Sequence, residues 1–178
     1  VIYGKSGIGK SIFLDLLIGI RSPNCGKIYY DKANLNDIDK NYLYERVGYV
    51  SADKYLFGKN IREAILLGRK ISKKEFNDLI DKFLIKEFLK NPEEKIYDQK
   101  NNFSSGQIQR VAIARGFINA KDILILDEAT ANLNSKFEDK IFKNINLLKK
   151  KLTIVLVTHN KTLSKFADEC INFEEINR

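Results

Sequence analysis

The fold of this chain is decided by the stretch Gly4-Lys5-Ser6-Gly7-Ile8-Gly9-Lys10-Ser11, in which two glycines bracket four residues and Lys and Ser follow. Glycines let the backbone bend until successive N–H groups converge on the oxygens of a phosphate. The helix that we expect from Ser11 to about Ile20 points its positive end at the same place. The stretch therefore predicts a phosphate-binding loop between a strand and a helix.

The two residues that close this loop suit the far end of a nucleoside triphosphate. Lys10 adds a full positive charge near the β- and γ-phosphates, and the Ser11 hydroxyl is able to bind Mg²⁺. A glycine-rich turn can match such a pattern by chance, but here a strand-like run and a helical pattern flank the loop as the motif requires. Taken alone, the loop predicts only that the chain binds a nucleotide.

Outward from the loop, short apolar runs alternate with amphipathic helical patterns, which predicts an α/β fold with a mainly parallel sheet. The run Ile123-Leu124-Ile125-Leu126 is apolar without alternation, as expected for a strand that is covered on both faces. We expect strands at residues 1–3, 27–30, 47–51, 123–127, 153–158 and 170–173.

The middle of the chain differs, because no strand pattern is convincing between about residues 61 and 102. Ser72 and Glu75 form a capping box in front of apolar residues at helical spacing: Phe76, Leu79, Ile80, Phe83 and Leu84. We therefore expect a helical subdomain at about residues 61–117, inserted into a single domain that spans residues 1–178.

Further along the chain, a second capping box is expected at Ser135 and Glu138, in front of another helix with an apolar stripe.

Two carboxylates, Asp127 and Glu128, directly follow the apolar run 123–126. Asp127 is placed to hold Mg²⁺ directly or through water, and Glu128 to polarise an attacking water as general base. Acidic pairs at strand ends are often merely solvated. In a parallel sheet, however, ligand sites lie at the carboxyl ends of the strands, where the phosphate loop also lies. The pair therefore extends the predicted nucleotide site.

The segment Phe103-Ser104-Ser105-Gly106-Gln107, followed by the helix-like run 108–115, closely resembles the signature motif of the ATP-binding cassette (ABC) ATPases. The usual core of that motif reads Leu-Ser-Gly-Gly-Gln. Physically, Ser104 and the backbone of Gly106 at a helix start form a second anion-binding helix end. An ordinary Ser-capped helix would explain the motif if it stood alone, but its place after a helical insert and before the strand at 123–127 favours the family.

The resemblance covers nearly the whole chain, since residues 128–134 are similar to the segment that leads to the D-loop, and Thr158-His159 is similar to the switch histidine. It implies an ABC ATPase fold and hydrolysis of ATP with Mg²⁺, with Glu128 and His159 as catalytic residues and Ser11 and Asp127 at the metal. It further implies a head-to-tail dimer. The expected contacts of ATP are Gly4, Lys5, Ser6, Gly7, Ile8, Gly9, Lys10, Ser11 and Ile12 of one subunit and Ser104, Ser105, Gly106 and Gln107 of the other.

Two further stretches are similar to the exporter branch of the family, namely residues 48–63 around the Q-loop and residues 96–102 before the signature, although Asp98 and Lys100 replace a usual Glu and Gly. In that branch a membrane domain is usually fused ahead of the cassette. The chain contains no Met and opens on Val1-Ile2, so we expect its N-terminus to be truncated. The resemblance thus implies a transmembrane domain upstream and a cassette at the cytoplasmic face of the membrane.

Departures from the family pattern concern coupling and hydrolysis. Ala52 stands where the Q-loop Gln is usual, Asn134 stands where the D-loop Asp is usual, and the chain starts too late to contain the usual adenine-stacking aromatic. One hypothesis is that Asp53 supplies the oxygen ligand that Ala52 lacks. Because Lys10, Ser11, Asp127, Glu128 and His159 are all present, we still predict hydrolysis.

The bulk properties leave other classes of protein open. The net charge of +8 is compatible with binding of nucleic acid. However, the sequence contains no motif of interleaved aromatic and basic residues, so we expect no nucleic-acid partner. Cys25 and Cys170 have no metal spacing, and no apolar run approaches the roughly 20 residues that span a bilayer. The alternatives to an exporter cassette are a soluble ABC ATPase of translation or DNA repair, a regulatory module that binds ATP without turnover, and a P-loop kinase.

Overall fold

The computed structural model describes residues 1–52, 55–93, 96, 103–147 and 152–176. These contain a parallel sheet with the strand order β4-β5-β6-β1-β7, which confirms the predicted α/β fold. Its strands are β1 (Ile2–Tyr3), β4 (Val47–Val50), β5 (Ile123–Asp127), β6 (Thr153–Val157) and β7 (Ile171–Asn172).

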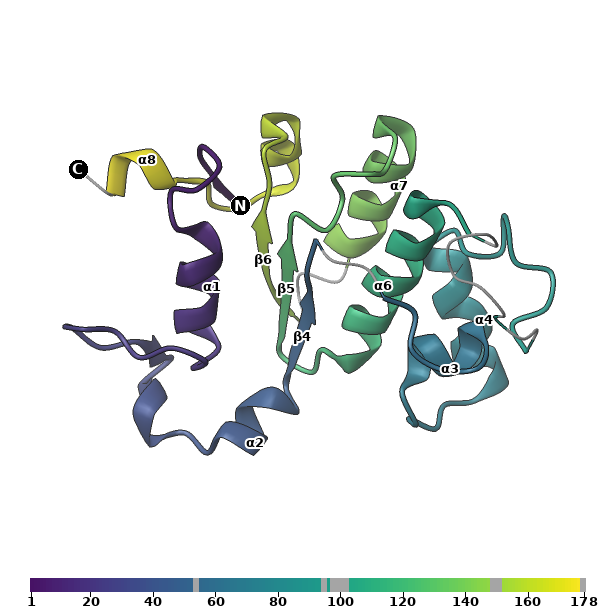
Figure 1. Cartoon of the computed structure of the whole chain (residues 1–178), viewed down its shortest axis with the longest axis horizontal. Helices are drawn as coiled ribbons and strands as arrows, with labels where there is room; N and C mark the ends of the chain where they lie inside the picture. The colour runs from purple at the N-terminus through teal and green to yellow at the C-terminus, as the bar shows by residue number, and fades with distance from the viewer. Residues whose placement is uncertain (53–54, 94–95, 97–102, 148–151, 177–178) are drawn as a thin grey trace.

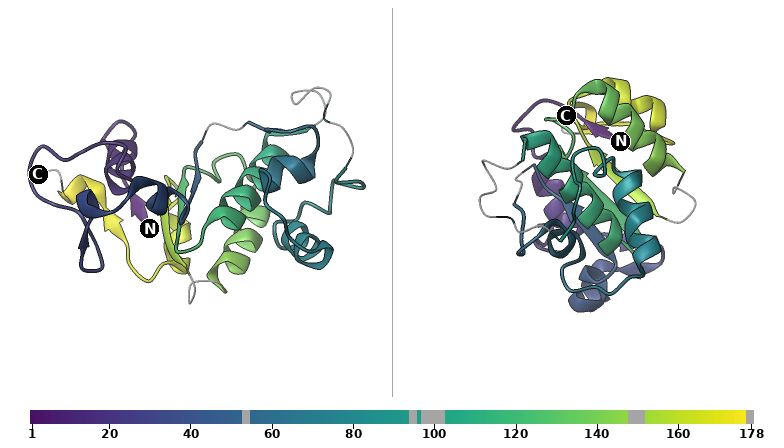
Figure 2. Two further views of the ribbon diagram at one scale, coloured as in Figure 1. Left: turned by 90° about the horizontal axis from the view of Figure 1, so that it is seen from below. Right: turned by 90° about the vertical axis from the view of Figure 1, so that its right-hand side faces the viewer.

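Helices cover both faces of this sheet, as Figure 1 shows. On one side lies α1 (Lys10–Leu17), and on the other lie α6 (Ser105–Asn119) and α7 (Ser135–Asn146). Beyond α6, and farther from the sheet, lie α3 (Ile61–Leu66) and α4 (Lys73–Lys82), an arrangement that is also visible in Figure 2. The described residues also contain α2 (Lys40–Tyr44), α8 (Phe173–Ile176) and the 3₁₀ turns η1 (Leu35–Asp37) and η2 (Lys161–Phe166).

None of the helices in the described part of the chain is both long and apolar enough to cross a membrane.

The alternation of side chains along the strands divides the core in two. Leu124 and Leu126 of β5 belong to a large cluster on the α6 side, whereas Ile125 belongs to a smaller cluster on the α1 side with Leu14 and Ile2. Successive side chains of a strand point to opposite faces, so Asp127 follows Ile125 onto the α1 face. This parity places the end of β5 over the start of α1.

The expected strand at 27–30 and the expected end of the first helix need correction. The strand expected at 27–30 is shortened to β2 (Tyr29–Tyr30) and lies outside the main sheet, paired antiparallel with β3 (Ala33–Asn34), because the chain turns back at Asp31, which has a φ of 51°. Helix α1 ends at Leu17 rather than near Ile20, because Gly19 adopts a φ of 72° just beyond it.

The capping box of Ser72 and Glu75 is confirmed at the start of α4, but the one expected at Ser135 and Glu138 is wrong. The N-cap of α7 is Asn134, whose side chain accepts a hydrogen bond from the Phe137 N–H at 3.0 Å. Glu138 is buried instead and accepts a hydrogen bond from Asn160 Nδ2 at 2.7 Å. The Glu138 carboxylate therefore binds the amide of Asn160, which is distant in the sequence, and does not contribute to the cap that the local pattern predicted.

Two glycines let α6 approach β4 more closely than side chains would permit. A methyl group on Gly48 would lie 2.1 Å from the carbonyl oxygen of Gly116 and 2.9 Å from the Ala120 Cβ. A methyl group on Gly116 would lie 2.2 Å from the Cγ2 atom of Val50. The backbone of α6 is thus seated directly on the strand next to β5.

We expect Gly48→Ala and Gly116→Ala each to lower the free energy of unfolding by about 1–3 kcal/mol, measured by urea denaturation, because the added methyl overpacks this contact. Val50→Ala should recover part of the loss in Gly116→Ala, where the obstacle is a side chain. It should recover none in Gly48→Ala, where the obstacle is backbone. A Gly48→Ala protein with the urea midpoint of wild type would show that the contact is not tight.

Candidate functional site

The loop between β1 and α1 curves around the side chain of Lys10. Gly7 and Gly9 have φ values of 79° and 102°, which favour glycine, and Gly9 is the N-cap of α1. The Lys10 side chain is buried within the loop, where its Nζ donates to the carbonyl oxygens of Gly4 at 2.8 Å and Lys5 at 2.7 Å. The protein therefore holds a cation at the start of a helix, the place where a phosphate would bind.

Ser11 and Asp127 come together at the edge of the sheet. The Ser11 Oγ, on the first turn of α1, donates to Asp127 Oδ2 at 3.2 Å, and Asp127 is only 9% exposed. A third group, not predicted from the sequence, joins them: the Tyr49 hydroxyl donates to the same Oδ2 atom at 3.1 Å. Burial, followed by the negative charge of Asp127, raises the pKa of Tyr49 well above its ordinary value, so its hydroxyl stays protonated.

Glu128 and His159 form a pair where β5 and β6 end. His159 Nε2 lies 2.6 Å from Glu128 Oε1. Glu128 has a φ of 50° and its N–H donates to the Val157 carbonyl at 3.0 Å, while the Thr158 N–H donates to the Ile2 carbonyl at 3.1 Å. The ends of β5, β6 and β1 are thereby tied together, and a hollow of about 440 Å³ lined by both members of the pair opens beside them.

The oxygen atoms of Ser11 and Asp127 fit a magnesium ion. Mg²⁺ prefers oxygen ligands and is usually held by one or two carboxylates together with substrate phosphates and water. Among the residues that the structure describes, no group of three or more His, Cys, Asp or Glu side chains could hold a metal by itself. A hydroxyl and one carboxylate next to a phosphate-binding loop match a metal that arrives with its nucleotide.

The signature-like residues lie at the start of α6, on the other side of the sheet from α1 (Figure 1). Ser104 is the N-cap, and it forms a capping box in which its Oγ accepts from the Gln107 N–H at 3.3 Å and its N–H donates to Gln107 Oε1 at 2.8 Å. Ser104 and Ser105 are exposed. The structure therefore does not bring residues 104–107 to the loop 4–11 of the same chain.

Gln109, for which the sequence predicted no role, links α6 to the segment that follows Glu128 in the chain. Its side chain is fully buried, its Nε2 donates to the Ala129 carbonyl, and its Oε1 accepts from the Asn132 N–H at 3.2 Å. The signal that could have identified it is a Gln within a helix that is buried on nearly all sides, because a buried polar side chain needs hydrogen-bond partners.

The remaining predicted site positions are either exposed or lie outside the described residues. Ala52 is exposed, as is Ile12 of α1. Asp53, with its hypothetical role at the metal, and residues 97–102 of the exporter-like stretch lie outside the described residues.

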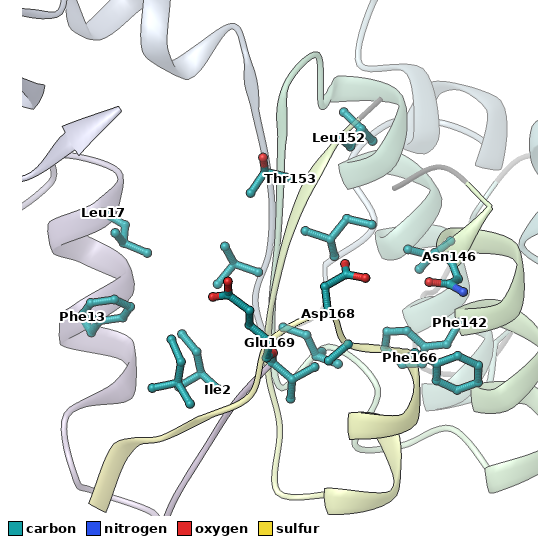
Figure 3. A pocket seen from close by; sticks show the side chains of 17 residues that line it. Ile2, Phe13, Leu17, Phe142, Asn146, Leu152, Thr153, Phe166, Asp168 and Glu169 are labelled. Atoms are coloured by element: carbon teal, nitrogen blue, oxygen red, sulfur yellow. The ribbon is translucent and has the colours of Figure 1, made fainter. Parts of the chain in front are cut away.

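A second hollow, also of about 440 Å³, lies along the apolar edge between α1 and α7. Figure 3 shows Phe13 and Leu17 on one side of it, Phe142 and Phe166 on the other, and the carboxylates of Asp168 and Glu169 between. Its lining contains none of the residues predicted to bind the nucleotide.

Comparison with known proteins identifies relatives of this chain. A family model described as "ABC transporter" matches residues 1–131. A probable ABC transporter ATP-binding/permease protein of Haemophilus influenzae is 32% identical over 97% of this chain and 32% of its own length. An ATP-dependent lipid A-core flippase of Blochmanniella floridana is 35% identical over 96% of this chain and 30% of its own length. The chain thus spans about a third of the length of these relatives.

Solved structures agree with the sequence comparisons. A bacterial Atm1-family ABC exporter with ATP bound superimposes with a TM-score of 0.86 at 26% identity, over 96% of this chain and 31% of the exporter chain. The dimeric structure of a bacterial ABC transporter cassette superimposes with a TM-score of 0.75 at 27% identity, over 96% of this chain and 78% of the cassette.

The cap on α7 yields a test at the D-loop position. We expect Asn134→Ala to lower the free energy of unfolding by about 1 kcal/mol, because the Phe137 N–H loses its side-chain partner. Asn134→Asp should keep the wild-type stability, since a carboxylate caps equally well. Urea denaturation of both variants measures this, and equal stability of Asn134→Ala and wild type would contradict it.

Proposed function

Because this chain belongs to the ABC transporter family, whose ATP-binding domains are ATPases, we propose that it binds ATP with Mg²⁺ and that its hydrolysis of ATP powers export across a membrane. The observation that carries the proposal is the meeting of Lys10, the Ser11–Asp127 pair and the Glu128–His159 pair where the parallel strands end. Such an edge is where ligands bind in open α/β sheets.

The phosphates of ATP would lie along residues 4–12, with Lys10 exchanging its carbonyl partners for phosphate oxygens. The pair Ser11 and Asp127 would hold Mg²⁺, which neutralises phosphate charge when bound. Glu128 would accept a proton from a water whose oxygen bonds to the γ-phosphorus, while the bond from that phosphorus to the β,γ-bridging oxygen breaks and ADP leaves. The position of His159 supports this role, because its Nε2 lies 2.6 Å from Glu128 Oε1 and so restricts the direction of the carboxylate.

A second cassette completes the site in this proposal. Residues 104–107 start α6 across the sheet from α1, so they would meet ATP only in another subunit arranged head to tail. The exposure of Ser104 and Ser105 supports such a contact, and one similar structure is a dimeric cassette. Hydrolysis would then separate the two halves.

The export function rests on the relatives. One is an ATP-binding/permease protein and another a flippase, and the chain covers about a third of each. We therefore propose that residues 1–178 form one cassette, with a helical subdomain at about 61–117, joined to a transmembrane domain upstream and located at the cytoplasmic face of the membrane. Soluble ABC proteins of translation or DNA repair are not favoured by these relatives.

Glu128→Gln tests the enzymatic part of the proposal. We expect steady-state phosphate release by the full-length protein to fall by about 100-fold or more while ATP binding is kept, because the amide retains the size of the side chain but is a far weaker base than the carboxylate. Glu45→Gln, which removes an exposed carboxylate paired with Lys121, serves as a control with the wild-type rate. Equal, measurable rates in wild type and Glu128→Gln would contradict the role of Glu128 as the base, and no phosphate release by either protein would mean that the chain is a regulatory module without turnover.

A further inference from the structure

The strand register puts Tyr49 on the same face of the sheet as Asp127. In the parallel pairing of β4 with β5, Tyr49 lies opposite Ile125 and Val50 lies opposite Leu126. Val50 faces α6, where it contacts Gly116, so its neighbour Tyr49 faces α1. Asp127 lies two residues beyond Ile125. It is therefore a diagonal neighbour of Tyr49, at a distance that a long aromatic side chain can reach.

Tyr49 and Ser11 hold the Asp127 carboxylate from two independent elements. Ser11 donates to Oδ2 from the first turn of α1 at 3.2 Å, and Tyr49 donates to the same atom from β4 at 3.1 Å. Asp127 itself is 9% exposed and sits at the last position of β5. Ser11 is a predicted ligand of the metal, and an oxygen that binds the metal is no longer free to orient Asp127 in the same way. The Tyr49 hydroxyl is outside the predicted ligand set, so its bond does not compete with the metal.

We propose that Tyr49 is a positioning residue of the Mg²⁺ site, whose hydroxyl fixes the Asp127 carboxylate for the metal that accompanies ATP. The inference rests on the proposed function, because it assigns a further residue to that same site. Ligand carboxylates are commonly held by hydrogen bonds of this kind, and loss of such a partner weakens metal binding.

The chemistry of a tyrosine hydroxyl suits this role. A tyrosine hydroxyl is neutral near physiological pH, so it donates its proton to the carboxylate and adds no second negative charge beside it. Although Tyr49 is 36% exposed, its hydroxyl points inward to Asp127. Ala52, three residues further along, offers only a methyl group.

A structural explanation competes with this one, since the same hydroxyl also satisfies a buried carboxylate in the folded protein. The two explanations differ in what they predict for nucleotide without metal. A positioning residue affects binding only when Mg²⁺ is present, whereas a fault in the fold of the site affects binding in both conditions.

Tyr49→Phe separates them, because it removes one oxygen and keeps the ring. The measurement is equilibrium binding of a non-hydrolysable ATP analogue with a β,γ-imido bridge to the full-length protein, titrated with Mg²⁺ and repeated in EDTA. We expect the Mg²⁺ concentration for half-maximal binding to rise about tenfold in Tyr49→Phe, with unchanged affinity in EDTA. The control is Tyr30→Phe, which removes another partly buried tyrosine hydroxyl, one that donates to the Leu17 carbonyl at 2.6 Å, and which should match wild type.

Each other outcome overturns the proposal in a recognisable way. If wild type binds the analogue and Tyr49→Phe has the same Mg²⁺ dependence, Tyr49 does not position the metal site, although the proposed function stands. If Tyr49→Phe binds more weakly by the same factor with Mg²⁺ and in EDTA, its role is structural. If wild type does not bind the analogue at all, the proposed function fails and this inference with it.

Discussion

The parallel pairing of β5 with its neighbours is the constraint on which the site depends. Because β4, β5, β6 and β1 run in the same direction, their carboxyl ends meet at one edge of the sheet. Residues as distant in sequence as Ser11, Tyr49 and Asp127 therefore converge there. The period of two along each strand then sends Asp127 to the face where α1 begins. An antiparallel β5 would place the same carboxylates at the opposite edge, away from the phosphate loop.

The features predicted well from the sequence are those with a strong local signal. The loop 4–11, the apolar run that becomes β5 and the cap at Ser72 depend on neighbours a few residues away, and the structure has an element at each. Tertiary contacts decided the rest. Glu138 left its expected cap for Asn160, and the contacts of Tyr49 with Asp127 and of Gln109 with Ala129 join elements that no local pattern relates.

The helix that begins at Ser105 has two attachments of different kinds. Its backbone rests on β4 through Gly48 and Gly116, and its Gln109 amide holds the segment after Glu128. The packing at Gly48 and Gly116 leaves no room for larger side chains, and the hydrogen bonds of Gln109 connect α6 to the backbone at Ala129 and Asn132. The start of α6, with its exposed Ser104 and Ser105, is thus positioned relative to Glu128 by the interior of the chain rather than by the surface.

The two hydrogen bonds from the Lys10 ammonium to the carbonyls of Gly4 and Lys5 order the loop before any ligand binds, which reduces the entropy that would be lost on binding. A flexible glycine loop that had to become ordered around each incoming anion would lose conformational freedom at every encounter, and affinity would fall accordingly. Here the loop is already wrapped around its own cation. Under the proposed function, binding of a phosphate would amount to an exchange of partners at a preorganised charge, and most of the ordering would already have taken place when the chain folds.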